Sequence, residues 1–183
     1  MIAPQDDAPG CASPPPLPPF TIRPARMGDR EALARLLTAS YSQLLVDDYT
    51  PELLREAVPL ITRPRAALLN AGSYYLADCG NGLLAAGGWT FHPPGRGATG
   101  PGEVGHIRQV ATAPDRAGKG VGRVLMEHAL FRAQASGVRR MLCFSTLTAQ
   151  GFYAKLGFVA QGEITLTLAP GLDFPAVQMC LEM

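Results

Sequence analysis

Residues 103–122 read EVGHIRQVATAPDRAGKGVG, and this stretch decides the fold. The run Gly105–Thr112 is typical of a β-strand, and Ala113-Pro114-Asp115 ends it. A glycine-rich turn at residues 118–122 then opens a segment with apolar side chains at helical spacing, namely Val121, Val124, Leu125 and Ala129. Glycine lets a backbone approach an anion closely, and the first N–H groups of a helix are unpaired. The stretch therefore predicts a strand, an anion-binding turn and an amphipathic helix.

Two common phosphate-binding loops do not fit this turn. A Walker loop needs Ser or Thr after Gly-Lys to hold Mg²⁺, whereas Gly120 follows Lys119. A dinucleotide-binding loop needs Gly-x-Gly-x-x-Gly, whereas a pattern that begins at Gly118 ends on Arg123. A tight strand-to-helix turn with no ligand remains an alternative, since glycine also has purely structural uses.

A second motif lies downstream of the glycine turn. The apolar run Met141–Thr146 predicts a strand, and Thr148 is expected to cap a short helix over Ala149–Leu156. Gly157 then ends that helix. Residues 151–158 read GFYAKLGF. The order of the two motifs and the distance between them are more specific than either motif alone.

Together the two motifs resemble those of the GCN5-related N-acetyltransferase (GNAT) family. The acetyl-CoA loop of that family has the pattern Arg/Gln-x-x-Gly-x-Gly/Ala, in which Gly120 and Gly122 fill the small positions while Ala117 replaces the first residue. The pattern Phe-Tyr-x-x-x-Gly-Phe at residues 152–158 looks like the second hallmark of the family. The resemblance covers roughly residues 20–183 and implies acetyl-CoA as a co-substrate.

The element order predicted from the sequence is β-α-α-β-β-β-α-β-α-β-β, which is an α/β arrangement. The resemblance implies a mixed, mostly antiparallel central sheet of about six or seven strands flanked by about four helices. It also implies that strands four and five splay apart, so that the pantetheine arm of acetyl-CoA lies in the notch. Caps are expected at Asp29 and Thr50, and a hairpin turn at Gly80-Asn81-Gly82. The expected strands are residues 20–23, 73–77, 83–90, 105–112, 141–146, 163–168 and 176–181, and the expected helices are residues 30–39, 51–57, 121–136 and 149–156.

The resemblance implies three groups of cofactor-binding residues. They are the central strand at Val110, Ala111 and Thr112, the loop at Ala117, Gly118, Lys119, Gly120, Val121 and Gly122, and the end of the fifth strand at Ser145 and Thr146. Hydroxyl groups at a strand end also serve as ordinary caps, and Arg116 and Lys119 either add charge near the phosphates or form a solvated basic turn.

Acetyl transfer needs a neutral amine, a donor for the developing oxyanion and stabilisation of the leaving thiolate. Tyr153 is the candidate acid, because a phenol with a pKa near ~10 is protonated at neutral pH; the alternative is a packing role. The backbone N–H of Val110 is the oxyanion donor implied by the resemblance. The base is His106, or Glu103 acting through a water molecule, or bulk water with no dedicated residue.

Composition limits the classes of function. The chain has 183 residues and a net charge of +1, which suits one domain and gives no sign of a nucleic-acid or membrane partner. Four widely spaced cysteines without a C-x-x-C pair predict reduced thiols in a cytoplasmic protein with no metal site. No apolar run reaches the ~18 residues that span a bilayer. Residues 1–19 hold seven prolines and are expected to form a disordered tail ahead of a single domain at residues 20–183.

The leading interpretation is an acetyl-CoA-dependent N-acetyltransferase that acts on a primary amine of a small molecule or protein by direct attack in a ternary complex. The alternatives are a non-catalytic acyl-CoA sensor on the same fold and an acyltransferase that uses a longer acyl group. The sequence does not specify the oligomeric state, and the resemblance adds a homodimer only as one possibility, because members of the family are often dimers. The acceptor pocket would draw on Asp47, Asp48 and Tyr49, on the loop at residues 92–102 and on the turn at residues 170–174, but these segments do not specify the amine.

Overall fold

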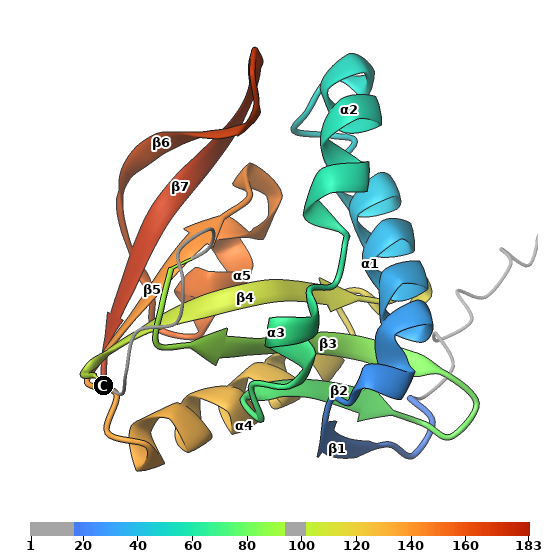
Figure 1. Cartoon of the computed structure of the whole chain (residues 1–183), viewed down its shortest axis with the longest axis vertical. Helices are drawn as coiled ribbons and strands as arrows, with labels where there is room; N and C mark the ends of the chain where they lie inside the picture. The colour runs from blue at the N-terminus through green and yellow to red at the C-terminus, as the bar shows by residue number, and fades with distance from the viewer. Residues whose placement is uncertain (1–16, 94–101) are drawn as a thin grey trace, which may run out of the picture.

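The computed structural model describes residues 17–93 and 102–183. A seven-stranded sheet with the order β1-β2-β3-β4-β5-β7-β6 runs through the molecule (Figure 1). Only the β4–β5 pair is parallel within the described part of the sheet, so the predicted mixed, mostly antiparallel sheet is confirmed. The expected tail at residues 1–19 and loop at residues 92–102 lie largely outside the described residues. The strands are β1 (Thr21–Pro24), β2 (Tyr74–Asp78), β3 (Leu83–Thr90), β4 (Val104–Thr112), β5 (Arg140–Ser145), β6 (Val159–Ala169) and β7 (Leu172–Glu182).

Helices cover both faces of the sheet (Figure 1). Helix α4 packs on one face of β2 and β3, and α1 packs on the opposite face of β3 and β4. The described helices are α1 (Arg30–Leu44), α2 (Pro51–Ile61), α3 (Ala66–Leu69), α4 (Val121–Ala135) and α5 (Gln150–Lys155). Four of the five were expected from the sequence. The prediction missed α3, because a single turn is too short to show a helical period.

The buried face of α4 differs from the predicted one at one position. Val124 is 47% exposed, so its assignment to the apolar face is wrong. Met126 is fully buried instead, and it lies on the same side of the helix as buried residues one turn before and after it. The α4 residues in the core are Val121, Gly122, Leu125, Met126, Ala129 and Ala133.

Several predicted helix boundaries are confirmed, with two exceptions. Thr50 caps α2 by accepting the N–H of Leu53 at 3.3 Å, and Gly157 ends the α5 segment with a φ of 92°. Asp29 does hold the N-cap position of α1, but its carboxylate binds the Arg23 guanidinium at 2.7 and 2.8 Å instead of the helix. Thr148 does not cap α5 either, because α5 begins only after a 3-10 turn.

The β4–β5 pair is short, and this feature shapes the site. The two strands pair only at Val104↔Arg140, Gly105↔Met141 and His106↔Leu142. Beyond His106 the two strands no longer pair, so the predicted splay between strands four and five is confirmed.

A bulge interrupts β4 at the start of the splay. Arg108 pairs with Gly88 and Ala111 pairs with Ala86, so two β4 residues face the single residue Gly87 on β3. One of them, Gln109, has a φ of 37° and is the only non-glycine residue with a positive φ in the described chain. A backbone held in such a sparsely populated region persists only where its surroundings fix it.

The other end of the sheet is a long hairpin. Strands β6 and β7 are eleven residues each, longer than the sequence predicted, and they rise away from the body of the molecule (Figure 1). A separate apolar cluster joins Phe174 on β7 to Leu54 and Val58 on α2. Helix α2 and the hairpin therefore contact each other across the open end of the splayed strands.

Candidate active site

The glycine turn before α4 has the geometry of an anion cradle. Gly118 and Gly120 have φ values of 74° and 87°, in the left-handed region that favours glycine. A side-chain carbon built on either residue would meet no atom of the described chain within 4 Å, so the space above the turn is open. No side chain caps the helix, and its first bond runs from the N–H of Val124 to the carbonyl of Gly120 at 3.0 Å. The N–H groups of the first turn before Val124 therefore lack partners within the helix.

Gly122 has a different role in the same turn. A side-chain carbon there would lie 2.8 Å from the hydroxyl oxygen of Thr112. Glycine at this position lets the start of α4 approach the end of β4. The close contact fixes the cradle relative to the strand that lines the notch.

The basic side chains around the turn are not equivalent. Arg116 forms an ion pair with the neighbouring Asp115 at 3.0 Å, and Arg123 pairs with Glu127 one turn along α4 at 2.7 Å. Lys119 has no ion-pair partner within the described ranges. Lys119 is therefore the cation of this turn with the greatest freedom to pair with a bound phosphate.

A cavity of about 70 Å³ occupies the notch between the splayed strands. Its lining comes from α1, β4, the end of β5 and the α5 segment, which are far apart in the sequence. Three of the site residues expected from the sequence meet here, and five further residues complete the lining. The lining is Tyr41, Ile107, Gln109, Val110, Phe144, Thr146, Ala149 and Tyr153.

Three of the cofactor-binding residues expected on β4 and β5 lie outside this cavity lining. Ala111 is buried in the cluster between the sheet and α1. Ser145 is also buried, and its hydroxyl donates to the carbonyl oxygen of Thr146 at 2.7 Å. Thr112 lies beside Gly122, at the boundary between the strand and the glycine turn.

Tyr153 lies on α5 at the buried side of the cavity. Its ring is 5% exposed and packs edge-on between Phe152 and Phe158, with ring centroids 5.2 and 5.4 Å away. Its hydroxyl lies beside the thiol of Cys143, and burial raises the pKa of Tyr153 well above its usual value. Burial also raises the pKa of Cys143 to about 12. Both groups are protonated at neutral pH, so Tyr153 is available as a hydrogen-bond donor.

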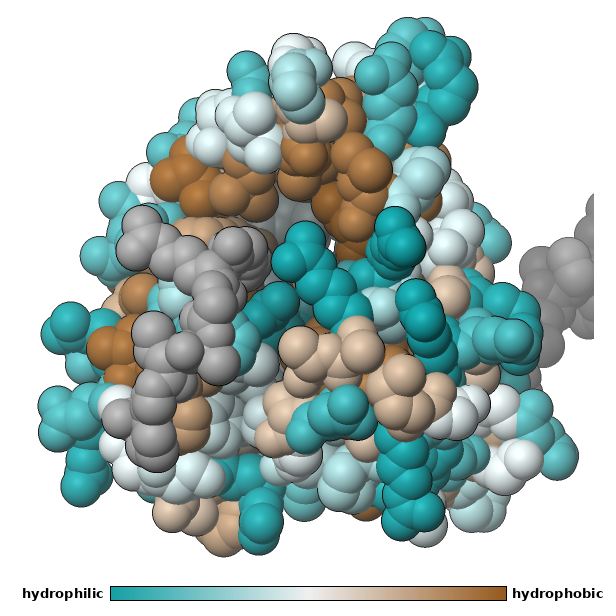
Figure 2. All heavy atoms as spheres, in the orientation of Figure 1, coloured by the Kyte–Doolittle hydropathy of each residue, from teal (hydrophilic) through white to brown (hydrophobic). Residues whose placement is uncertain are grey.

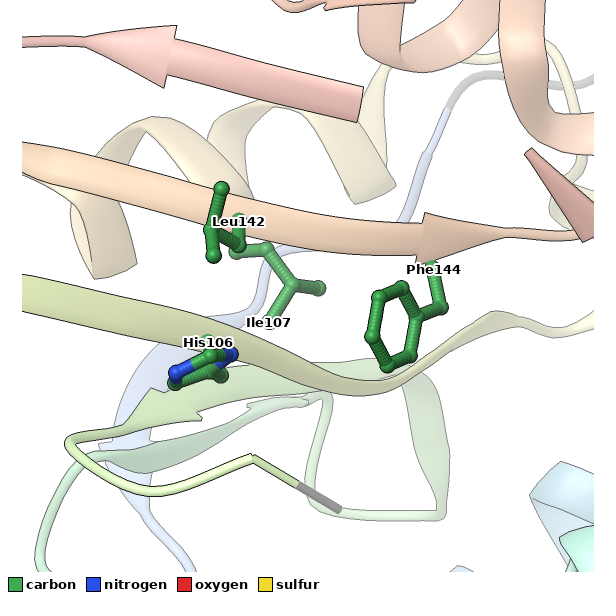
Figure 3. A pocket seen from close by; sticks show the side chains of 4 residues that line it. All are labelled: His106, Ile107, Leu142 and Phe144. Carbon is green, nitrogen blue, oxygen red and sulfur yellow. The ribbon is translucent and has the colours of Figure 1, made fainter. Parts of the chain in front are cut away.

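His106 lies where β4 and β5 begin to separate. Figure 3 shows its imidazole beside a crevice that Ile107, Leu142 and Phe144 also line. Burial lowers the pKa of His106, and the cationic Arg108 and the nearby His92 lower it further. The imidazole is therefore neutral at pH 7 and can accept a proton.

Glu103 lies apart from the cavity. Its side chain is exposed just before β4. Its carbonyl oxygen accepts the N–H groups of Arg139 and Arg140 at 2.7 and 3.0 Å, next to the paired end of β4 and β5. The carboxylate is absent from the lining of both the cavity and the His106 crevice.

Two residues of the cavity wall are held by an unexpected pair of tyrosines. The hydroxyl of Tyr74 donates to the carbonyl of Gln109 at 2.7 Å, and the hydroxyl of Tyr41 donates to the carbonyl of Val110 at 3.2 Å. Sequence reasoning missed both tyrosines. A signal for Tyr41 exists, because it continues the buried stripe of Leu33 and Leu37 at intervals of four residues.

The segment between α1 and α2 is largely structural. The Tyr49 hydroxyl accepts the N–H of Leu147 at 2.8 Å and donates to the carbonyl of Pro175 at 2.8 Å. The Asp48 carboxylate accepts the hydroxyl of Thr148 at 2.7 Å. Of the three residues named for the acceptor pocket, Asp47 alone is exposed without a hydrogen bond in the part of the chain that the structure describes.

The surface above the notch is hollowed. Figure 2 shows a depression between two apolar surfaces, one over α2 and the other over the hairpin of β6 and β7. Hydrophilic residues border the same depression on its lower side (Figure 2). The splayed strands are thus open toward this face as well as toward the glycine turn.

Known proteins are similar to this chain in sequence and in fold. A sequence model described as the acetyltransferase (GNAT) family matches residues 36–158, more than half of the chain. This chain belongs to the GNAT acetyltransferase family. The match includes the glycine turn, the splayed strands and Tyr153, so the resemblance read from the sequence is confirmed and the protein is a member of an enzyme family.

Solved structures of GNAT acetyltransferases have the same fold. A GCN5-related N-acetyltransferase from Rhodopseudomonas palustris has a TM-score of 0.69 and 23% identity, covering 90% of this chain and 96% of that one. The PaiA N-acetyltransferase from Thermoplasma acidophilum, solved with coenzyme A, has a TM-score of 0.63 and 14% identity over 90% and 99%. A GNAT family acetyltransferase from Brucella melitensis, solved with acetyl-CoA, has a TM-score of 0.57 and 18% identity over 90% and 88%.

The described residues contain neither a membrane-spanning helix nor a metal-binding cluster of side chains. No helix in residues 17–93 or 102–183 combines the length and apolar character needed to cross a membrane. No group of three or more His, Cys, Asp and Glu side chains in those same ranges is arranged to hold a metal ion.

Proposed function

We propose that this GNAT protein transfers an acetyl group from acetyl-CoA to a primary amine of a small molecule or protein. The observation that carries the proposal is the cavity between β4 and β5, which Val110 and Tyr153 both line. The cavity lies beside β4, the strand that leads to the glycine turn. Both substrates would bind together, and the amine would attack the acyl carbon directly.

The residues present fit acetyl-CoA. Gly118 and Gly120 leave open space above free N–H groups, which suits the diphosphate of the cofactor. The splay leaves β4 without a β5 partner beyond His106, so an extended amide-containing arm can pair with β4. A cavity of about 70 Å³ at the end of that path favours a short acyl group over a long one.

The reaction exchanges two bonds at the acyl carbon. A bond forms between the amine nitrogen and the acyl carbon, the bond from that carbon to sulfur breaks, and the amine loses a proton. Acetyl-CoA supplies the activated acyl group as a thioester, and the products are an amide and the thiol of CoA. The tasks left for the protein are positioning, charge stabilisation and proton movement.

Three residues are proposed for these tasks. The N–H of Val110, at the β4 bulge, would donate to the acyl oxygen as negative charge develops there. The hydroxyl of Tyr153 would donate a hydrogen bond to the departing sulfur, because its raised pKa keeps the proton on the phenol. His106 would accept the proton of the amine, directly or through water, because its lowered pKa keeps it neutral.

The test is an assay of thiol release from acetyl-CoA with a broad panel of amines. Turnover with at least one class of amine, together with its acetylated product by mass spectrometry, is the expected result. Tight binding of acetyl-CoA with no turnover on any amine would support the sensor alternative instead. If longer acyl-CoA donors react faster than acetyl-CoA in the same assay, the result would favour an acyltransferase that uses a longer acyl group.

A further inference from the structure

Arg108 lies next to the bulge of β4, on the face of the sheet opposite α4. Its neighbour Ile107 packs in the core on the α4 side. The next residue, Gln109, reaches the other face, where its side-chain amide donates to the carbonyl of Ile61 at the end of α2 at 2.8 Å. The Arg108 guanidinium donates to the hydroxyl of Thr90 at 3.0 Å. Gln109 thus lines the cavity of the notch and reaches α2, and Arg108 precedes it on β4, just outside the cavity lining.

Arg108 is a half-buried cation without a carboxylate partner. It takes part in none of the ion pairs of the described residues, and the segment 94–101 contains no acidic side chain in its sequence. Burial lowers the pKa of Arg108, and the nearby Arg65 lowers it further, which agrees with the lack of an ion-pair partner. Partly burying an unpaired charge costs free energy. A bound anion would remove that cost.

The groups around Arg108 reinforce the need for an anion. The cation of Arg65 lowers the pKa of Arg108, while the phenol of Tyr74 acts in the opposite direction. His106 in turn lies close to Arg108 and His92. Neither Arg108 nor His106 forms an ion pair with a carboxylate among the described residues. This side of the notch therefore attracts negative charge.

The phosphates of CoA are not the anion that Arg108 meets. Arg108 lies four residues before Thr112 on β4, which would be about 13 Å along an unbroken strand and is somewhat less here because of the bulge. The glycine turn lies past Thr112 and packs against the start of α4, on the other face of the sheet. Lys119 and the free N–H groups of that turn serve the phosphate end.

We propose that the amine substrate also carries a carboxylate, as an amino acid does, and that Arg108 binds this carboxylate while Arg65 adds attraction. The inference depends on the proposed function, because it names the class of amine that the acetyltransferase uses. The planar guanidinium matches a carboxylate with two parallel hydrogen bonds, and five N–H groups are available to it. His106, near Arg108, then lies close to the amine of the same molecule.

The experiment compares matched sets of amines in the thiol-release assay. Each set contains an amino acid, its carboxamide and the amine that lacks the carboxyl group, for several different side chains, with one aminophosphonate included. We expect kcat/KM for the amino acids to exceed that for the neutral partners by at least about tenfold, as a charge-assisted hydrogen bond allows. Preference for the aminophosphonate over every carboxylate would overturn the carboxylate assignment.

Arg108→Gln is the decisive variant. The ratio of kcat/KM for amino acid over carboxamide should fall toward one, mainly through a higher KM for the amino acid. Arg35→Gln is the matched control, since Arg35 is 74% exposed on α1 and the same charge is lost; this variant should keep the ratio. If Arg108→Gln has a lower Tm than the parent protein, Arg108→Lys tests the role of Arg108 instead. The ratio of kcat/KM for amino acid over carboxamide should then lie between the values of the parent and of Arg108→Gln, because lysine keeps the charge but loses the two parallel hydrogen bonds.

The failures of the two proposals are distinguishable. Turnover of neutral amines equal to that of amino acids, or an Arg108→Gln variant that keeps the amino-acid preference, would overturn the role of Arg108 and leave the acetyltransferase function standing. Binding of acetyl-CoA without turnover of any amine in any set would overturn the acetyltransferase function and this inference with it.

Discussion

At the scale of single residues, Gln109 is held in a strained conformation by its surroundings. Its φ of 37° is costly for a residue with a side chain. The Tyr74 hydroxyl holds its carbonyl oxygen, and the carbonyl of Ile61 holds its side-chain amide. Tyr41 holds the carbonyl of the next residue, Val110. The conformation that aims the proposed oxyanion donor is therefore maintained by groups from three other elements.

Loss of one of these hydroxyls should cost both stability and turnover. In Tyr74→Phe the buried carbonyl of Gln109 loses its donor, which should lower the free energy of unfolding by about 1–3 kcal/mol. We also expect kcat to fall, because the bulge that aims Val110 loosens. Urea denaturation and the thiol-release assay measure the two effects. The matched control is Tyr75→Phe, since the Tyr75 hydroxyl forms no hydrogen bond within the described structure; a loss as large in the control would contradict the role of the Tyr74 bond.

Tyr153→Phe should slow turnover and leave cofactor binding unchanged. The phenylalanine ring keeps the packing between Phe152 and Phe158, while the donor to the leaving sulfur is lost. We expect kcat to fall by about 100-fold, with the Kd for acetyl-CoA from calorimetry unaltered. A kcat equal to that of the parent protein would remove Tyr153 from the mechanism and leave it as a packing residue.

At the scale of elements, the turn before α4 depends on being free of side chains and negative charge. Gly120→Asp would place a carboxylate against the phosphates, and we expect acetyl-CoA binding to become undetectable by calorimetry. The substitution also strains a residue with a φ of 87°. Gly72→Asp is the matched control, because Gly72 has a φ of 70° and open space but lies outside the site. If Gly120→Asp still binds acetyl-CoA as the control does, the cradle is not the phosphate site.

Most elements could be predicted from the sequence, because apolar periodicity and glycine reflect local rules. Gly80 and Gly157 marked a hairpin and a helix end, and both have positive φ values. Val124 was assigned wrongly because position 124 fits the apolar stripe by spacing alone, while the contact that decides is with the distant β-sheet. Asp29 was expected to cap α1, but Arg23, brought close by β1, takes its carboxylate.

The candidate site was predictable only in part, for a physical reason. Motifs pointed to Val110, Thr146 and Tyr153, and these do line one cavity. The bulge at Gln109 has no local signature, because it arises from the pairing of β4 with β3 and from hydroxyl groups supplied by other elements. Arg108 was passed over for the same reason, since the lack of a counter-charge appears only once the chain is folded.

At the scale of the whole molecule, stability should depend on pH through two histidines. Burial lowers the pKa of His106 and of His128 below the unfolded value of about 6.5. Below that value the unfolded chain binds more protons than the native protein, so the free energy of unfolding falls as pH decreases. The contribution is complete above about pH 7 and is lost between the unfolded pKa and the lower folded pKa.

Urea denaturation at several pH values between about 5 and 8 checks this expectation. The double variant His106→Gln/His128→Gln should show a flatter dependence over the interval below about pH 6.5. Asp29 and Asp78 do not contribute to the pH dependence in this interval, because their pKa values are lowered from 3.8. The stability that these two carboxylates contribute is lost only at more acid pH. If the free energy of unfolding of the double variant depends on pH as steeply as that of the parent protein, the pH dependence does not come from these two histidines.

The three residue pairs that join β4 to β5 have a mechanical consequence. They are the only β-ladder pairs in the described chain that join strands β1–β4 to strands β5–β7, and the apolar core under α4 packs behind them. A molecule bound beyond His106 would replace the missing contacts between β4 and β5. Amide protons of both groups of strands should then exchange with deuterium more slowly when acetyl-CoA is present, including those of β7, which contributes no residue to the cavity lining.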